Sequence, residues 1–169
     1  MQHIFTITLF LVLFSCNDSS SKLVAQTKEK ATIPKIEKSD AEWKKELSDM
    51  EYYVLREAGT ERAFSGDLWD HKADGVYVCR ACGLALFDSN TKYKSGTGWP
   101  SYYAPVSENN VEMDTDYKIG YARTEVHCAR CNGHLGHVFN DGPEPTGLRY
   151  CINSVSLDFV ERDSLKKQK

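Results

Sequence analysis

The sequence predicts a mainly β domain of two small antiparallel sheets, packed in a tent-like or barrel-like arrangement, with short helices at its N-terminal side. After Gly66 the chain consists of short segments rich in Val, Tyr, Phe and Ile with glycines between them, which is typical of strands joined by tight turns. Two helix-start motifs precede these segments, and two Cys-x-x-Cys pairs lie within them. The 169 residues allow one compact domain with short appendages.

The first fifteen residues have the composition of a signal peptide. The segment from Ile4 to Phe14 is almost wholly apolar, but at about eleven residues it is shorter than the roughly 20 that a helix needs to cross a membrane. Leu13-Phe14-Ser15-Cys16 resembles the bacterial lipobox, whose cysteine is lipidated. We therefore expect removal of residues 1–15 and export of a lipoprotein, anchored through Cys16 to the envelope membrane and facing the periplasm. Because no Lys or Arg precedes the apolar segment, an uncleaved anchor and an ordinary signal peptide stay open.

Three further regions follow the signal peptide. Residues 16–38 are rich in Ser, Lys, Glu and Thr, and such a composition buries too little apolar surface to offset the entropy of ordering. We expect them to form a flexible tether. The folded domain is expected over residues 39–162, followed by a polar tail over residues 163–169.

Two short helices are expected at the start of the domain. Ser39-Asp40-Ala41-Glu42 and Ser48-Asp49-Met50-Glu51 have the Ser-x-x-Glu form, in which the serine and glutamate side chains accept hydrogen bonds from each other's amides. Ala58-Gly59 should end the second helix. Apolar residues four apart give each helix a stripe to bury: Trp43 with Leu47, and Met50 with Val54.

The strands are expected where β-branched and aromatic residues cluster between glycines. The candidates are Val76–Val78, Ala85–Phe87, Ile119–Ala122, Leu135–Phe139, Tyr150–Asn153 and Leu157–Val160.

The charge balance argues against a nucleic-acid partner. The chain has 21 Lys and Arg against 24 Asp and Glu, a formal net charge of −3. No basic block is present that could neutralise a run of phosphates. We expect no nucleic acid among the partners, and a monomer.

Four cysteines have the spacing of a metal site. Cys79 and Cys82 form one Cys-x-x-Cys pair, and Cys128 and Cys131 form the other. Each pair is followed by Gly or Asn, residues that tolerate the left-handed backbone of a tight turn. Two such turns can supply the closed Cys₄ shell of one structural Zn²⁺ per chain, which would staple the domain. Two disulfides are the alternative in an oxidising compartment.

Cys151 is the cysteine left for chemistry. In a strand over Tyr150–Asn153, alternation places Cys151 on the same face as Arg149 and Asn153, while Tyr150 points into the core. An arginine beside a thiol is expected to lower its pKa and to favour the nucleophilic thiolate. A lone cysteine in a strand can equally be an inert buried residue.

Two histidines follow the second cysteine pair. His134 and His137 lie in Gly133-His134-Leu135-Gly136-His137-Val138-Phe139, so a metal bound nearby would hold their segment rigid. Proton donors on a rigid element suit acid catalysis. A structural role for the imidazoles stays open.

Several motifs together resemble one enzyme family, the MsrB-type peptide-methionine (R)-S-oxide reductases. The resemblance spans about Ala41 to Val160. The motifs, in order with both cysteine pairs, are Gly98-Trp99-Pro100-Ser101, the two-histidine segment, Asp141-Gly142-Pro143 and Arg149-Tyr150-Cys151-Ile152-Asn153-Ser154.

The resemblance implies a zinc-stapled fold of two antiparallel sheets and a reaction in which Cys151 attacks the sulfur of methionine sulfoxide in oxidised proteins. Methionine is released and Cys151 becomes a sulfenic acid. His134 and His137 would assist protonation of the departing oxygen, and Trp99 would pack on the substrate methyl group. The remaining implied site residues, which would order the hydrogen bonds around the oxygen, are Arg149, Asp141 and Asn153.

One position departs from the family pattern. Many members carry a resolving cysteine where this chain has Thr97, and a hydroxyl cannot form its disulfide. We therefore expect an external thiol, such as a thioredoxin-like carrier, to reduce the Cys151 sulfenic acid directly. Two other classes stay open, a zinc-stapled binding module without chemistry and a Cys/His hydrolase.

Overall fold

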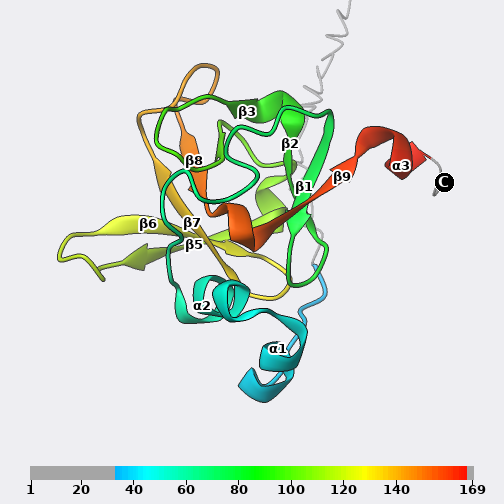
Figure 1. Ribbon diagram of the computed structural model, residues 1–169. Coiled ribbons are helices and arrows are strands. Elements are labelled where there is room, and N and C mark those ends of the chain that lie inside the picture. Colours follow the sequence, from blue (N-terminus) through cyan, green and yellow to red (C-terminus); the bar gives the residue numbers. More distant parts are fainter. Residues whose placement is uncertain (1–32, 167–169) are drawn as a thin grey trace, which may run out of the picture.

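Two capped helices lie near the start of residues 33–166, the part of the chain that this computed structural model describes (Figure 1). Helix α1 spans Asp40–Glu46 and helix α2 spans Asp49–Glu57, each opened by the complete capping box expected at Ser39 and Ser48. The second helix ends at Ala58, whose φ of 51° is left-handed. These helix predictions are confirmed.

The apolar stripe expected on α2 is only half right. Val54 is buried together with Tyr52 and Leu55, but Met50 is 51% exposed. Met50 lies in the first turn, where it borders a surface hollow with Arg80 instead of the core. On α1, Trp43 and Leu47 are both buried as expected.

The strands form a three-stranded and a six-stranded antiparallel sheet, which confirms the predicted fold class. The small sheet has the order β2-β1-β9, with bounds Ala85–Asp88, Gly75–Cys79 and Leu157–Glu161. The large sheet has the order β3-β4-β8-β7-β6-β5, with bounds Lys92–Tyr93, Ser101–Tyr102, Arg149–Ile152, His134–Phe139, Arg123–Cys128 and Val111–Asp116. Short 3₁₀ helices span Ser89–Thr91, Glu108–Asn110 and Ser154–Ser156, and α3 spans Arg162–Lys166.

The strand expected over Ile119–Ala122 is wrong, because these residues form the turn between β5 and β6. Asp116 accepts a hydrogen bond from the amide of Lys118, and Gly120 has a φ of 89°. Both features favour a reversal of the chain. The apolar residues Ile119 and Tyr121 are therefore exposed to solvent and are not part of the core.

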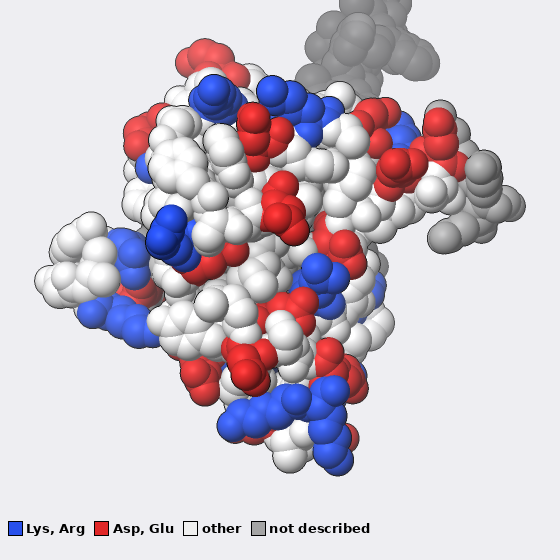
Figure 2. All heavy atoms as spheres, in the orientation of Figure 1, with Lys and Arg blue, Asp and Glu red and all other residues white. Residues whose placement is uncertain are grey.

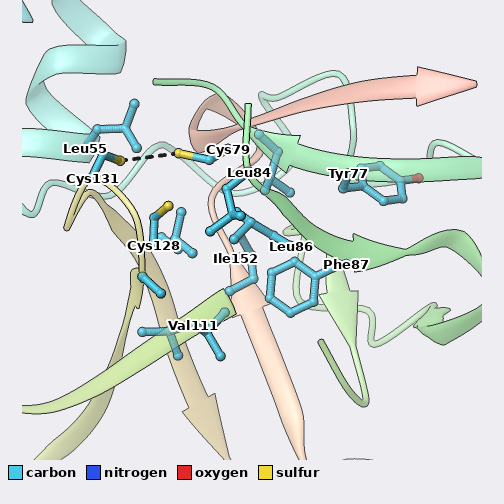
Figure 3. Packing of buried hydrophobic residues seen from close by; sticks show 14 of the residues in the cluster. Leu55, Tyr77, Cys79, Leu84, Leu86, Phe87, Val111, Cys128, Cys131 and Ile152 are labelled. Carbon is cyan, nitrogen blue, oxygen red and sulfur yellow. Dashed lines mark hydrogen bonds between the residues drawn. The ribbon is translucent and has the colours of Figure 1, made fainter. Parts of the chain in front are cut away.

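The packed core lies where the two sheets meet (Figure 3). Tyr77 and Phe87 come from the small sheet, whereas Tyr150 and Ile152 come from the large one. Phe87 stacks on Tyr102 with ring centroids 4.4 Å apart. Burial of each such side chain stabilises the fold by roughly 1.5–3 kcal/mol.

Strands β7 and β8 approach each other at a position that only glycine fits. A Cβ atom on Gly136 would lie 2.1 Å from the carbonyl oxygen of Cys151. Gly136 also has a φ of 155°. Its neighbour His137 pairs directly with Cys151 in the antiparallel register. The close pairing therefore places an imidazole-bearing residue opposite the thiol.

The ends of the domain differ from the predicted boundaries. Ile33 and Ile36 pack against the core, and the Ile36 amide donates to the carbonyl of Arg130 at 2.8 Å. The domain contacts thus begin within the segment expected as a tether, because two isoleucines gain burial there. Helix α3 includes the start of the expected polar tail. The predicted signal peptide and Cys16 lie outside the described residues.

Within residues 33–166, no helix is both long enough and apolar enough to span a bilayer.

Candidate active site and metal-binding cluster

The four paired cysteines gather into one cluster that links the two sheets. Cys79 ends β1 of the small sheet, and Cys128 ends β6 of the large sheet. The turn after each strand supplies the second cysteine, Cys82 or Cys131. The expected left-handed positions are present, with φ of 70° at Gly83 and 55° at Asn132.

The sulfur positions suit tetrahedral coordination. All four Sγ atoms lie within 4.8 Å of one another. The distance is 3.6 Å between Cys79 and Cys131 and 3.5 Å between Cys82 and Cys128. A metal with bonds of about 2.3 Å to sulfur would set its ligands roughly 3.8 Å apart. A disulfide bond of about 2.05 Å is much shorter, so the geometry favours a metal over the alternative of two disulfides.

The cluster is enclosed by the hydrophobic core. Figure 3 shows Cys79, Cys128 and Cys131 beside Leu55 and Leu84. Three of the four cysteines are buried, and Cys82 is half-buried. Such a closed set of ligands leaves no coordination position for substrate, so a metal here would hold the fold together and take no part in the reaction.

Cys151 lies in a small surface pocket of about 130 Å³. Of the residues predicted for the site, this pocket brings together Trp99, His137, Cys151 and Asn153. It adds lining residues that the sequence reasoning did not select: Thr60, Arg123, Gly136 and Phe139. His134, Arg149 and Asp141 do not line it. The pocket can hold one small apolar group between the aromatic side chains that line it and the sulfur of Cys151.

The environment of Cys151 acts on its pKa in two opposing ways. Burial raises the pKa of the thiol above its ordinary value, whereas Thr97 and Arg149 lower it. The expected lowering by Arg149 is present, but burial outweighs it and the net direction of the pKa is upward, so the expectation of a thiolate favoured near neutral pH is wrong for the protein without substrate. Loss of solvation outweighs the cationic neighbour because the thiolate is the form that burial disfavours. Strand alternation is as expected, with Tyr150 and Ile152 buried.

The hydroxyl group of Thr97 contacts the thiol of Cys151. Thr97 Oγ1 lies 3.9 Å from Cys151 Sγ. Among the described residues, no histidine forms a hydrogen bond with this sulfur. A Cys/His hydrolase needs that contact to activate its nucleophile, so the geometry gives the hydrolase alternative no support.

Each predicted histidine is paired with a carboxylate that the sequence reasoning missed. His137 Nε2 lies 2.9 Å from Asp116 Oδ2, and His134 Nδ1 contacts Glu125 Oε1. Arg123 also pairs with Asp116. A sequence signal existed in the polar, alternating segment around Glu125, but it does not show which residue faces a histidine.

Both histidines are neutral near pH 7. Burial lowers the pKa of His134 to about 4, and burial also lowers the pKa of His137. Hydrogen bonds lower the pKa of Asp116, first from the amide of Lys118 and then from His137. The carboxylate can only accept, so His137 donates its Nε2 proton to Asp116. The imidazoles are thus oriented but uncharged before substrate binds.

Arg149 and Asp141 form a bidentate ion pair beside the pocket. Arg149 Nε and Nη2 donate to the two Asp141 carboxylate oxygens at 2.8 and 2.9 Å. The guanidinium lies 4.4 Å from the centre of the Phe139 ring, which lines the pocket. The pair therefore supports the pocket wall and places a positive charge near Cys151.

Glu61 connects the predicted residues Trp99 and Asn153. Its carbonyl accepts from Trp99 Nε1 at 3.2 Å, and its amide donates to Asn153 Oδ1 at 3.1 Å. Its buried carboxylate accepts from the amides of Ser154 and Val155. Asn153 Nδ2 donates to the Leu135 carbonyl at 3.0 Å. Nothing in the sequence pattern distinguishes Glu61 from an ordinary surface glutamate.

The fold and the pocket define a class of protein, a thiol-dependent enzyme on a small β domain held by a four-cysteine metal-binding cluster. The family is shown by comparison with known proteins: the SelR domain matches residues 47–161, and the chain belongs to this family. The family resemblance read from the motifs is thereby confirmed.

Curated relatives cover most of the chain. It is 58% identical over 124 residues to the peptide methionine sulfoxide reductase MsrB of Leptospira interrogans, which spans 73% of this chain and 95% of that protein. It is 59% identical over 126 residues to the MsrB of Thiobacillus denitrificans, covering 75% and 96%. The MsrB of Methanosarcina mazei is 55% identical over 135 residues, covering 80% and 96%. A solved Mis18 "Yippee-like" domain aligns with a TM-score of 0.43 and 23% identity over 52% of this chain and 96% of that one.

The raised pKa of Cys151 predicts slow alkylation of this thiol at neutral pH. Only the thiolate reacts with iodoacetamide, so labelling should increase with pH and reach half its maximum above pH 9, the ordinary value. Arg149→Met should move this midpoint higher, because the guanidinium lowers the pKa. Peptide mass spectrometry measures labelling of Cys151 apart from the clustered cysteines. A midpoint below pH 8 in the unaltered protein would contradict the prediction.

Proposed function

We propose that the protein is an oxidoreductase that reduces methionine (R)-sulfoxide residues in oxidised proteins to methionine. Membership of the SelR family supports this activity, and the relatives are named for it. The observation that carries the proposal is the pocket in which Cys151 faces the same space as Trp99. The preference for the R epimer rests on the family resemblance. The binding module without chemistry would not need a half-buried thiol in this position.

The first half-reaction reduces the sulfoxide and oxidises Cys151. The Cys151 sulfur forms a bond to the substrate sulfur, and the sulfoxide oxygen takes up two protons, one of them from the thiol, and leaves as water when its bond to sulfur breaks. Water then attacks the Cys151 sulfur, which breaks the sulfur–sulfur bond, releases methionine and returns one proton, so that an oxygen atom ends on the cysteine. The net change is thiol plus sulfoxide giving sulfenic acid plus methionine, so cysteine is oxidised by two electrons and the sulfoxide is reduced by two.

The residues around Cys151 assist proton transfer to the sulfoxide oxygen and stabilise the charge of the thiolate. His137 pairs with Cys151 in the sheet register and lines the same pocket, so its imidazole is placed to assist protonation of the sulfoxide oxygen once substrate is bound. The His134 ring packs against the His137 ring, with the two ring centroids 5.5 Å apart. Arg149, oriented by Asp141, stabilises the thiolate once substrate displaces water. Trp99 contacts the substrate methyl group. Asn153 forms part of the pocket wall and is held there by its hydrogen bonds to Leu135 and Glu61.

The second half-reaction uses an external thiol. The sulfenic acid condenses with one thiol to give a mixed disulfide and water, and a second thiol then releases reduced Cys151 and a disulfide. Thr97 is placed 3.9 Å from the sulfur, but its hydroxyl cannot form a disulfide. A thioredoxin-like carrier supplies the two thiols and hence both electrons.

Turnover of the two epimers of a methionine sulfoxide peptide tests the activity. With dithiothreitol as reductant, the R epimer should be reduced and the S epimer left. Cys151→Ser should lower turnover by about 1,000-fold or more, because serine cannot accept the oxygen. Metal content measured on the same samples shows whether the variant is folded. Retained turnover in a folded Cys151→Ser protein would refute the proposal.

The route of regeneration is checked in the same assay without reductant. The unaltered protein should hold a sulfenic acid at Cys151 that dimedone traps. Thr97→Cys is the matched variant, since it should convert that intermediate into an intramolecular disulfide. An internal disulfide in the unaltered protein would overturn direct reduction.

We further propose that Zn²⁺ is the metal of the four-cysteine cluster. Four thiolates in a closed tetrahedral set are the ligands typical of structural zinc. Elemental analysis should find about one zinc per chain. Cys128→Ser should lose the metal and lower the midpoint of thermal unfolding by roughly 10 °C or more, because metal binding contributes to folding. Cys151→Ser is the control and should keep both; a stable protein free of zinc would contradict the assignment.

The N-terminal motif supports a proposal about location. We propose a lipoprotein anchored through Cys16 at the bacterial envelope, where it repairs proteins outside the cytoplasm. Mass spectrometry of the mature N-terminus should find a lipidated Cys16 and no residue before it. Cys16→Ser should release the protein from the membrane fraction. An unmodified N-terminus in the unaltered protein would refute this.

A further inference from the structure

The turn between β5 and β6 exposes large apolar side chains on a projecting hairpin. We define the hairpin tip as residues 117–122. Within it Tyr117 is 68% exposed, Ile119 is 50% exposed and Tyr121 is 62% exposed. Figure 1 shows β5 and β6 extending away from the body of the domain. In Figure 2 the end of this projection is mostly uncharged, beside Lys and Arg side chains.

One side of the hairpin tip is joined to the active-site pocket. Asp116 and Arg123, the residues that flank the tip, are register partners and form an ion pair. Arg123 lines the pocket, and Asp116 accepts the hydrogen bond of His137. The exposed apolar residues of the tip are thus adjacent in the chain to Arg123, which lines the pocket, and to Asp116, which contacts a lining residue.

The other side of the tip reaches the end of helix α2. Lys118 Nζ donates to the carbonyls of Ala58 at 3.0 Å and Glu57 at 3.3 Å. A cation is favourable at a helix C-terminus. Thr60, two residues further along, lines the pocket. The tip is therefore held in place along the edge of the pocket.

The pocket itself is too small for more than one side chain. Its volume of about 130 Å³ lies below the roughly 300–1,000 Å³ of sites that enclose whole small molecules. When the sulfoxide side chain of a protein enters it, the neighbouring residues of that polypeptide must lie on the surface outside. The hairpin tip offers them an apolar surface there.

We propose that the hairpin tip is a docking surface for the polypeptide that flanks the methionine sulfoxide, selecting segments with apolar residues beside it. This inference rests on the reductase activity proposed above. Tyrosine suits the role because it gives a large contact area for little loss of side-chain entropy. The geometry favours a polypeptide over a membrane surface, because the single cation of the tip, Lys118, is bound to helix carbonyls instead of being directed to lipid phosphates.

A triple variant compared on two substrates tests the proposal. Tyr117→Ser, Ile119→Ser and Tyr121→Ser are combined, and dithiothreitol in excess removes any need for a carrier protein. With oxidised β-casein as substrate, KM should increase roughly five- to tenfold with kcat unchanged, since removal of apolar contact weakens binding outside the reacting group. With N-acetylmethionine sulfoxide amide, kcat/KM should stay within about twofold, because that substrate occupies only the pocket.

A matched control replaces three exposed apolar residues that do not line the pocket. Met50→Ser, Val106→Ser and Leu165→Ser remove side chains that are 51%, 40% and 36% exposed. This control should leave both substrates unaffected. An equal KM increase in the control would overturn the proposal, because the loss of any exposed apolar side chains would then weaken substrate binding equally.

The remaining outcomes also decide the question. Equal losses on both substrates, or no change on either, would overturn the docking role. Loss of binding to phosphatidylglycerol vesicles with unchanged KM for casein would assign the tip to a membrane and overturn it too. Failure of the unaltered protein to reduce the small substrate would instead refute the reductase activity, so the two failures are distinguishable.

Discussion

The pairing of β7 with β8 is the constraint on which the site depends. Gly136 lets the two backbones approach so closely that a side chain at that position would overlap the Cys151 carbonyl. The same register sets His137 opposite Cys151. Because both residues belong to the same sheet, the thiol and the imidazole are held by main-chain hydrogen bonds. Strand pairing therefore fixes the positions of this thiol and imidazole relative to each other.

The sequence was most informative where local chemistry determines structure. The capping boxes at Ser39 and Ser48 and the left-handed turn at Asn132 need only neighbouring residues, and all were predicted. The fold class followed from the glycine-bounded segments. The strand expected at Ile119–Ala122 failed because apolar composition alone does not distinguish a buried strand from an exposed turn. Strands β3, β4, β5 and β6 were not predicted: β3 and β4 have only two residues each, and β5 is mostly exposed and polar.

The candidate site was predictable only in part, for a similar reason. Trp99, His137, Cys151 and Asn153 lie in motifs and meet in one pocket. Asp116, Glu125 and Glu61 act through contacts between segments far apart in the chain, which no local pattern encodes. The pKa of Cys151 was misjudged because burial, a property of the whole fold, outweighs the adjacent arginine. Residue identity was thus easier to predict than residue environment.

The position of Thr97 has a kinetic consequence. With a hydroxyl beside the sulfur in place of a second thiol, the domain cannot store the oxidation internally. In the proposed reaction cycle, the repaired protein must leave before the electron donor arrives, since both must occupy the same small pocket to reach Cys151. The two half-reactions then alternate in a ping-pong order, and an abundant substrate would compete with the donor for the oxidised enzyme.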